Sequence, residues 1–151
     1  MPKVGASMAD ISTEYQNPDP AAYIFEVVEA TYDEKTEKAP KSGLDVVRGT
    51  HKIKSKIVSL FPEEETEHSG KPVTDFINIH TKEGEPNEIS LAQLKRYFEA
   101  IIPERADAED ADTEELVGGR FVAQLRHRKS NQPGDDRVFA EIKGSTISPV
   151  E

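Results

Sequence analysis

The chain has 151 residues, 35% of them hydrophobic and 32% charged, with a formal net charge of −10. This length predicts one domain with a thin core, and the acidity argues against nucleic-acid affinity arising from bulk charge alone. The absence of cysteine excludes disulfides and Cys-based metal or thiolate sites, and it favours a cytoplasmic compartment. No apolar run is long enough for a transmembrane helix.

Residues 1–20 are predicted to form a flexible N-terminal arm. They are rich in Pro, Asp, Ser and Ala and lack the apolar core of a signal peptide. The folded domain is expected over 21–147, followed by a short tail at 148–151. Its first strand is expected at 23–32, where YIFEVVEATY is aromatic and β-branched. Residues 33–43, with Pro40 and Gly43, are predicted to be a charged loop.

Two further strands show strict alternation. In 45–61, Ile53 and Ile57 share one face while Lys52, Lys54 and Lys56 share the other, and Pro62 ends the strand. An acidic loop follows at 63–70. In 73–81, one face is expected to hold Val73, Asp75, Ile77 and Ile79, and the other Thr74, Phe76, Asn78 and His80.

One helix is predicted, beginning at Ser90 and ending before Pro103. Ser90 with Gln93 fits a capping box, and the apolar positions at helical spacing are Leu91, Leu94, Phe98 and Ile101. An acidic stretch covers 104–115, and a short helical turn is expected at 112–117. Strands at 120–128 and 137–143 then form a hairpin around the turn at 130–136.

This order of elements predicts a mainly β fold with one principal helix. Five strands with the helix between the third and the fourth suit an OB-like barrel, whose one end the helix would close. A two-sheet β-sandwich is the alternative.

The distribution of charge suggests a function. Residues 46–60 and 118–130 each carry four basic residues and no acid, and in both segments basic side chains alternate along a strand. If the two stripes face the same way, they form a cationic groove in which single-stranded nucleic acid could lie, with aromatic rings stacking on bases. The candidate site residues are Arg48, Lys52, Lys54, Lys56, Phe76, His80, Arg126 and Arg128, with Tyr23, Phe25 or Tyr32 as a further stacking ring. The alternative interpretation is the ordinary solvated face of a half-buried sheet.

Several segments occur in a characteristic order and spacing: 23–30, the Ser42-Gly43 loop before a basic strand, 75–79, the helix at 91–98, and the closing segments 115–118 and 141–143. In these features the chain resembles small phage and prophage proteins of replication and recombination modules. The resemblance spans roughly residues 20–147. It implies an OB-like fold and binding of single-stranded DNA without strong sequence preference in the bacterial host cytoplasm, with replication or recombination proteins as further partners.

No catalytic or metal-binding motif is evident. The four histidines, His51, His68, His80 and His127, form neither HxH nor HExxH, and the acidic run lacks the central glycine of an EF-hand loop. No enzyme activity, metal or cofactor is therefore expected. The second functional hypothesis is a non-enzymatic structural or adaptor protein, for example of a virion. The choice between DNA and RNA and the formation of a homo-oligomer are left open.

Overall fold

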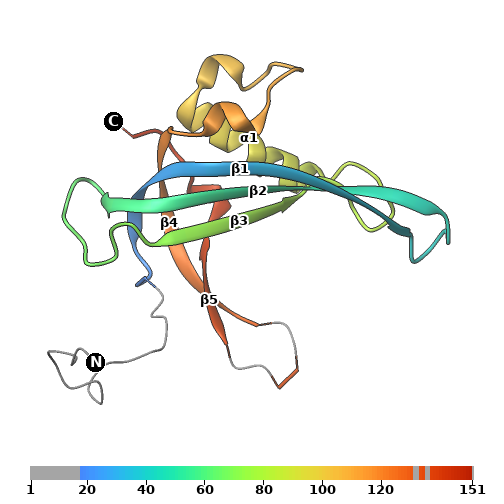
Figure 1. Ribbon diagram of the computed structural model, residues 1–151, viewed down its shortest axis with the longest axis horizontal. Coiled ribbons are helices and arrows are strands. Elements are labelled where there is room, and N and C mark those ends of the chain that lie inside the picture. Colours follow the sequence, from blue (N-terminus) through green and yellow to red (C-terminus); the bar gives the residue numbers. More distant parts are fainter. Residues whose placement is uncertain (1–17, 131–132, 135–136, 151) are drawn as a thin grey trace, which may run out of the picture.

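The computed structural model describes residues 18–130, 133–134 and 137–150, so most of the expected arm and part of the 130–136 turn lie outside the described residues. The fold is mainly β (Figure 1). Its strands are β1 (Ala22–Lys38), β2 (Asp45–Leu60), β3 (Pro72–Asn78), β4 (Arg120–Lys129) and β5 (Val138–Ile142). The helices are α1 (Glu88–Ile101) and the short 3-10 turns η2 (Pro103–Arg105), η3 (Thr113–Leu116) and η4 (Gly144–Thr146). No helix in the described part of the chain is long and apolar enough to cross a membrane.

The five strands form one antiparallel sheet in the order β3-β2-β1-β4-β5. The hairpin of β4 and β5 runs steeply across the direction of β1 to β3 (Figure 1). The predicted OB-like barrel is not confirmed, because the sheet is not closed: within residues 18–130, 133–134 and 137–150 no hydrogen-bonded ladder joins β3 to β5. The two-sheet alternative does not describe the molecule either, since all strands belong to one sheet.

The first hairpin is longer than the sequence suggests. Residues 33–38, expected in a loop, continue β1 and pair with residues 45–50 of β2. The turn is closed by a hydrogen bond from the Ala39 N–H to the Leu44 carbonyl, and Gly43 adopts a φ of 71° there. The loop prediction was therefore wrong: alternating charges hid a strand whose Glu37 pairs with Arg48 across the ladder at 2.6 Å.

The core lies between the inner face of the curved sheet and α1. The Phe25 ring stacks on Phe121 at 5.2 Å, and Tyr97 meets Phe121 edge-on at 5.1 Å. The principal buried side chains are Tyr23, Phe25, Val27, Ile53, Ile57, Val73, Ile77, Tyr97, Leu116, Phe121 and Leu125. Because Tyr23 and Phe25 are almost fully buried, neither can serve as the exposed stacking ring suggested from the sequence.

A bulge in β1 explains how this strand pairs both with β2 and with β4, which run in different directions. The pairing register with β2 shifts between Val27 and Glu29. At that point Val27 exchanges backbone hydrogen bonds with Gly118 and Gly119, just before β4. The bulge bends β1, because an extra residue on one strand increases the local twist. The first part of β1, residues 22–26, pairs with β4.

Helix α1 begins earlier than predicted. The Asn87 side chain accepts a hydrogen bond from the Ser90 N–H at 3.3 Å, so Asn87 and not Ser90 caps the helix. Tyr97 and Phe98 are its buried residues, Leu94 and Ile101 are half-buried, and Leu91 is 38% exposed. The expectation that Leu91 lies in the core was wrong.

Candidate nucleic-acid interface

The two basic stripes lie on the same face of the sheet. Along β2, Ile53 and Ile57 point into the core, so the three lysines between and beside them point outward. Lys56 is paired in register with Glu26 of β1, which is itself paired with Arg120 of β4. Because residues paired across a ladder share a face and alternate residues repeat it, Arg126 and Arg128 also lie on the outer face. The sheet curves strongly between the stripes, so they do not lie on one flat surface.

A groove of about 570 Å³ separates the edges of β3 and β5. Phe76 of β3 stands on one rim, and Phe139 of β5 stands on the other together with Arg126 and Arg128. The remaining lining residues are Pro72, Val73, Thr74, Asp75, Gln93, Ala140, Glu141, Ile142 and Gly144. The seam that fails to close as a ladder therefore forms a hollow with aromatic and cationic rims.

Both rim rings are exposed and contact cations. Phe76 is 63% exposed, and the Lys52 Nζ lies 5.7 Å from the centre of its ring. Phe139 is 39% exposed, and the Arg128 and Arg137 guanidinium carbons lie 5.7 and 5.5 Å from its ring centre. Sequence reasoning missed Phe139. Its register pairing with Arg128 in the 120–143 hairpin is the signal that could have revealed it.

Acidic side chains from neighbouring strands neutralise part of this cationic face. Glu26 lies 3.4 Å from the Lys56 Nζ and 3.2 Å from the Arg120 Nε. The hydrogen bond from Arg120 is the largest cause of the lowered pKa of Glu26. Glu141 accepts hydrogen bonds from Arg126 at 2.7 Å and from Arg128 at 2.9 Å.

Two lysines of the face lack such partners. Lys52 and Lys54 form no ion pair with any carboxylate of the described chain, although Glu29 lies opposite Lys54 in the ladder. Lys52 pairs with Phe76 and Lys54 with Thr74 across the β2–β3 ladder, which places both lysines beside the groove. They are therefore the cations of this face that a phosphate could approach without displacing a carboxylate of the described chain.

The floor of the groove is anchored to α1. The Asp75 Oδ2 accepts hydrogen bonds from the Gln93 Nε2 at 2.6 Å and from the Tyr97 hydroxyl at 2.7 Å. Burial is the main cause of the raised pKa of Asp75, and the nearby Glu141 charge adds to it, while the two hydrogen bonds oppose it. Burial beside this carboxylate also holds the pKa of Tyr97 well above its ordinary value.

Two of the eight predicted site residues, Arg48 and His80, neither line nor flank the groove. Arg48 donates to Glu37 within the β1–β2 hairpin, and the His80 Nδ1 accepts the Gly49 N–H at 2.8 Å. Tyr32, a third candidate ring, lies on the same hairpin against His51, with ring centres 4.5 Å apart. Of the eight candidates, three line the groove (Phe76, Arg126, Arg128), and three flank it on the same face (Lys52, Lys54, Lys56).

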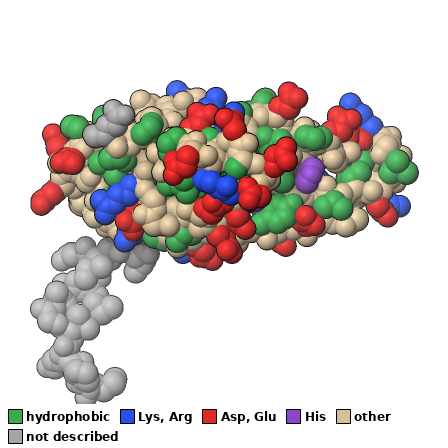
Figure 2. Space-filling model, turned by 90° about the horizontal axis from the view of Figure 1, so that it is seen from above, with side chains coloured by type: hydrophobic (Ala, Val, Ile, Leu, Met, Phe, Trp, Pro, Cys, Tyr) green, Lys and Arg blue, Asp and Glu red, His purple; other side chains and the backbone are tan. Residues whose placement is uncertain are grey.

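The face of the molecule seen in Figure 2 is of mixed charge. Figure 2 views the part of the molecule that lies uppermost in Figure 1, where acidic side chains are spread widely and basic ones occur in small groups.

Away from the groove, Asp19, Glu67 and His68 bring two carboxylates and an imidazole together, with ligand atoms within 4.8 Å of one another. This is the group within the described residues whose side chains could hold a metal ion.

Comparison with family models and with curated proteins finds no match for this chain. The resemblance to phage proteins therefore stays a prediction, and the function has to be argued from the geometry of the surface.

Proposed function

We propose that the protein binds single-stranded nucleic acid, with DNA as the first candidate, in the groove between β3 and β5. The observation that carries the proposal is the pair of exposed rings, Phe76 and Phe139, on opposite rims, each in contact with a cation. Non-specific single-strand binders use this combination, in which bases stack on aromatic rings and cations follow the backbone.

The proposal extends to the fold. An OB-like barrel places a helix between its third and fourth strands, and α1 occupies that position here. The order β3-β2-β1-β4-β5 would become a closed OB-like barrel if β3 paired with β5. We therefore interpret the domain as an OB-like barrel left open along one seam, with the ligand in that seam. A phage-type replication or recombination module in the bacterial cytoplasm is the proposed setting, and proteins of that module are proposed partners.

The chemistry favours a flexible strand over a duplex. The groove has an aromatic ring on each rim, and bases can reach such rings only when they are unpaired. The net charge of −10 would repel a stiff polyanion that cannot confine its phosphates to the cationic rims. Sequence preference should be weak, because stacking uses the face of a base and does not read its hydrogen-bonding edges.

Fluorescence anisotropy with a labelled oligo(dT) strand over a range of salt concentrations tests this function. The combined change Lys52→Gln and Lys54→Gln should weaken binding and flatten the slope of log affinity against log salt by up to about 1.4 units, at about 0.7 per phosphate contact. Lys82→Gln with Lys95→Gln, an equal change of charge outside the groove, should leave the slope unchanged. Labelled oligo(U) and duplex DNA complete the comparison.

Aromatic variants separate stacking from charge. Phe76→Ala and Phe139→Ala should each weaken binding by about 1–3 kcal/mol without altering the salt slope, because a stacked ring neutralises no charge. Ile89→Ala is the matched control, since Ile89 is 82% exposed and does not line the groove. Failure to bind single strands at low salt, where attraction is strongest, would refute the proposal.

A protein adaptor is the second candidate, supported by the far end of the β1–β2 hairpin. Leu44 and Val47 are 67% and 46% exposed there, and Tyr32, further along β1, is 43% exposed; exposed apolar side chains that gather on one surface are a feature of protein contact sites. Refutation of nucleic-acid binding would favour this function.

A further inference from the structure

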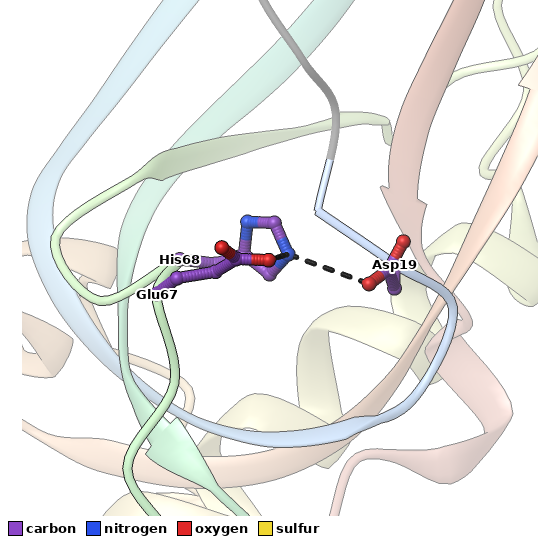
Figure 3. Close-up of side chains that lie close together, drawn as sticks. All are labelled: Asp19, Glu67 and His68. Atoms are coloured by element: carbon purple, nitrogen blue, oxygen red, sulfur yellow. Dashed lines mark ion pairs between the residues drawn. The ribbon is translucent and has the colours of Figure 1, made fainter.

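Asp19, Glu67 and His68 converge at the point where the chain approaches β1 (Figure 3). The His68 Nε2 lies 3.6 Å from the Asp19 Oδ2 and 3.7 Å from the Glu67 Oε1. Asp19 precedes β1, whereas Glu67 and His68 belong to the loop between β2 and β3. The three residues are brought together by the fold and not by their spacing in the sequence.

His68 is the unusual member of this group. Its side chain is only 9% exposed, and its Nε2 is buried with no hydrogen-bond partner among the described residues. The separations to the two carboxylates are too long for hydrogen bonds, which have donor–acceptor distances of roughly 2.7–3.2 Å. Buried polar atoms are almost always bonded in folded proteins, so an unbonded nitrogen directed at two carboxylates calls for a ligand.

The backbone holds the three residues in place. The Asp19 carbonyl accepts a hydrogen bond from the Tyr23 hydroxyl at 2.7 Å, and the carbonyl of Pro18 lies 2.6 Å from the His127 Nε2. On the other side, the His68 N–H donates to the Thr66 hydroxyl, and the Gly70 N–H donates to the Ile57 carbonyl of β2. Both segments are thus fixed to the sheet before any ligand arrives.

We propose that Asp19, Glu67 and His68 bind a divalent transition-metal ion, with Zn²⁺ as the best fit. Zn²⁺ binds imidazole nitrogen and carboxylate oxygen at about 2.0–2.2 Å, so two ligand atoms of a tetrahedral site lie about 3.4 Å apart. The observed separations of 3.6 and 3.7 Å are close to that value. Mg²⁺ and Ca²⁺ prefer all-oxygen ligands, so the imidazole disfavours them.

The carboxylates can complete the geometry. The side chains of Asp19 and Glu67 are 81% and 84% exposed, so each can rotate toward the ion with little steric hindrance. Water from the open side would supply the fourth ligand. The bound ion would join the segment before β1 to the β2–β3 loop, adding a cross-link between parts of the chain that are distant in sequence.

Lys71 competes with the metal. Its Nζ lies 3.0 Å from the His68 Nδ1, and because an ammonium can only donate, Nδ1 accepts and the hydrogen of a neutral ring sits on Nε2. Metal on Nε2 requires the opposite tautomer, with a hydrogen on Nδ1, and hence displacement of Lys71. Lys71→Gln offers an acceptor to that hydrogen and should tighten metal binding.

Titration of the full chain with Zn²⁺, after treatment with a chelator, tests the site by calorimetry, and Co²⁺ absorption reports the coordination geometry. We expect one equivalent to bind. Asp19→Asn and Glu67→Gln should each lower Zn²⁺ affinity by at least about tenfold. Mutation of a residue that only hydrogen-bonds to a metal ligand already lowers metal affinity by about 10- to 100-fold, so loss of a ligand itself should cost no less. The double variant should abolish binding.

Glu109→Gln, which removes an exposed carboxylate elsewhere, is the matched control and should leave Zn²⁺ affinity unchanged. Both ligand carboxylates are on the surface, so their variants should fold, as circular dichroism can confirm. Absence of stoichiometric binding, or binding unaltered in the double variant, would overturn the proposal. Weaker binding in Lys71→Gln would overturn the assignment of His68 Nε2 as the metal ligand.

Discussion

Tyr97, fully buried on α1, donates a hydrogen bond of 2.7 Å to Asp75 of β3, directly beneath the groove. The same oxygen of Asp75 accepts the Gln93 side chain at 2.6 Å. One carboxylate oxygen therefore connects two positions of the helix to the edge of the sheet. This contact adds a link between α1 and β3, the strand that carries Phe76, to the pairing of β3 with β2.

The wild-type protein should lose folding stability as pH rises, because the pKa of Asp75 is raised, and Asp75→Asn should remove this loss. Burial raises the pKa of Asp75 in the folded protein, so the native state holds this proton more tightly than the unfolded state does. Stability therefore falls as pH rises from the ordinary aspartate pKa through the raised one. Urea unfolding at several values between about pH 4 and pH 7 should show a less negative slope of stability against pH in the variant. An identical slope in both proteins would contradict the assignment.

Tyr97→Phe should destabilise the protein by about 1–3 kcal/mol, because it removes a hydrogen bond to a charged acceptor while keeping the packing against Phe121. Combined with Asp75→Asn in a double-mutant cycle, the two changes should be non-additive by at least about 0.5 kcal/mol, as expected for residues in contact. Chemical denaturation supplies all four free energies of unfolding. Additive effects would show that the pair contributes no coupling.

The assigned face of α1 predicts a large difference between two apolar truncations. Phe98→Ala should cost about 3–5 kcal/mol, because the side chain is 5% exposed and joins the core. Leu91→Ala, at a position 38% exposed, should cost well under half as much. Equal losses in urea unfolding would mean that the helix is rotated about its axis.

Glu141→Gln should strengthen single-strand binding. Glu141 holds Arg126 and Arg128 together, and its neutralisation would leave both guanidinium groups available to phosphates. The salt slope should steepen by up to about 1.4 units, at about 0.7 for each of the two guanidinium groups that gains a phosphate contact. Glu99→Gln on the exposed side of α1 provides the same change in charge and should leave the slope unchanged. Weaker binding in Glu141→Gln would indicate that the carboxylate positions the arginines instead of masking them.

The strands could be predicted because one-sided burial leaves a period of two in the sequence, as in the run from Lys52 to Ile57. The direction of the basic side chains followed from the same period. The neutralisation of these basic side chains could not be predicted in this way. Glu26 and Glu141, which neutralise them, lie on neighbouring strands, and only the pairing register shows that they are opposite the basic residues. A stretch without acids in sequence is therefore not a stretch without acids in space.

Other misses also have specific causes. Ser90 matched a capping box, yet Asn87 lies where the helix begins, and its short amide side chain caps equally well. His68 looked isolated because its two carboxylate neighbours include Asp19, far away along the chain. Closure of the sheet depends on the separation of two edges, which no local pattern encodes.

The open seam leaves two strand edges, one on β3 and one on β5, that no further strand of the described chain covers. Uncovered edges are templates on which another extended chain can add itself, and they are a common origin of aggregation. Two features reduce that risk here: the edges are only seven and five residues long, and Pro72 at the start of β3 has no N–H to donate. Solubility at high concentration is thus a property that these two short strands help to determine.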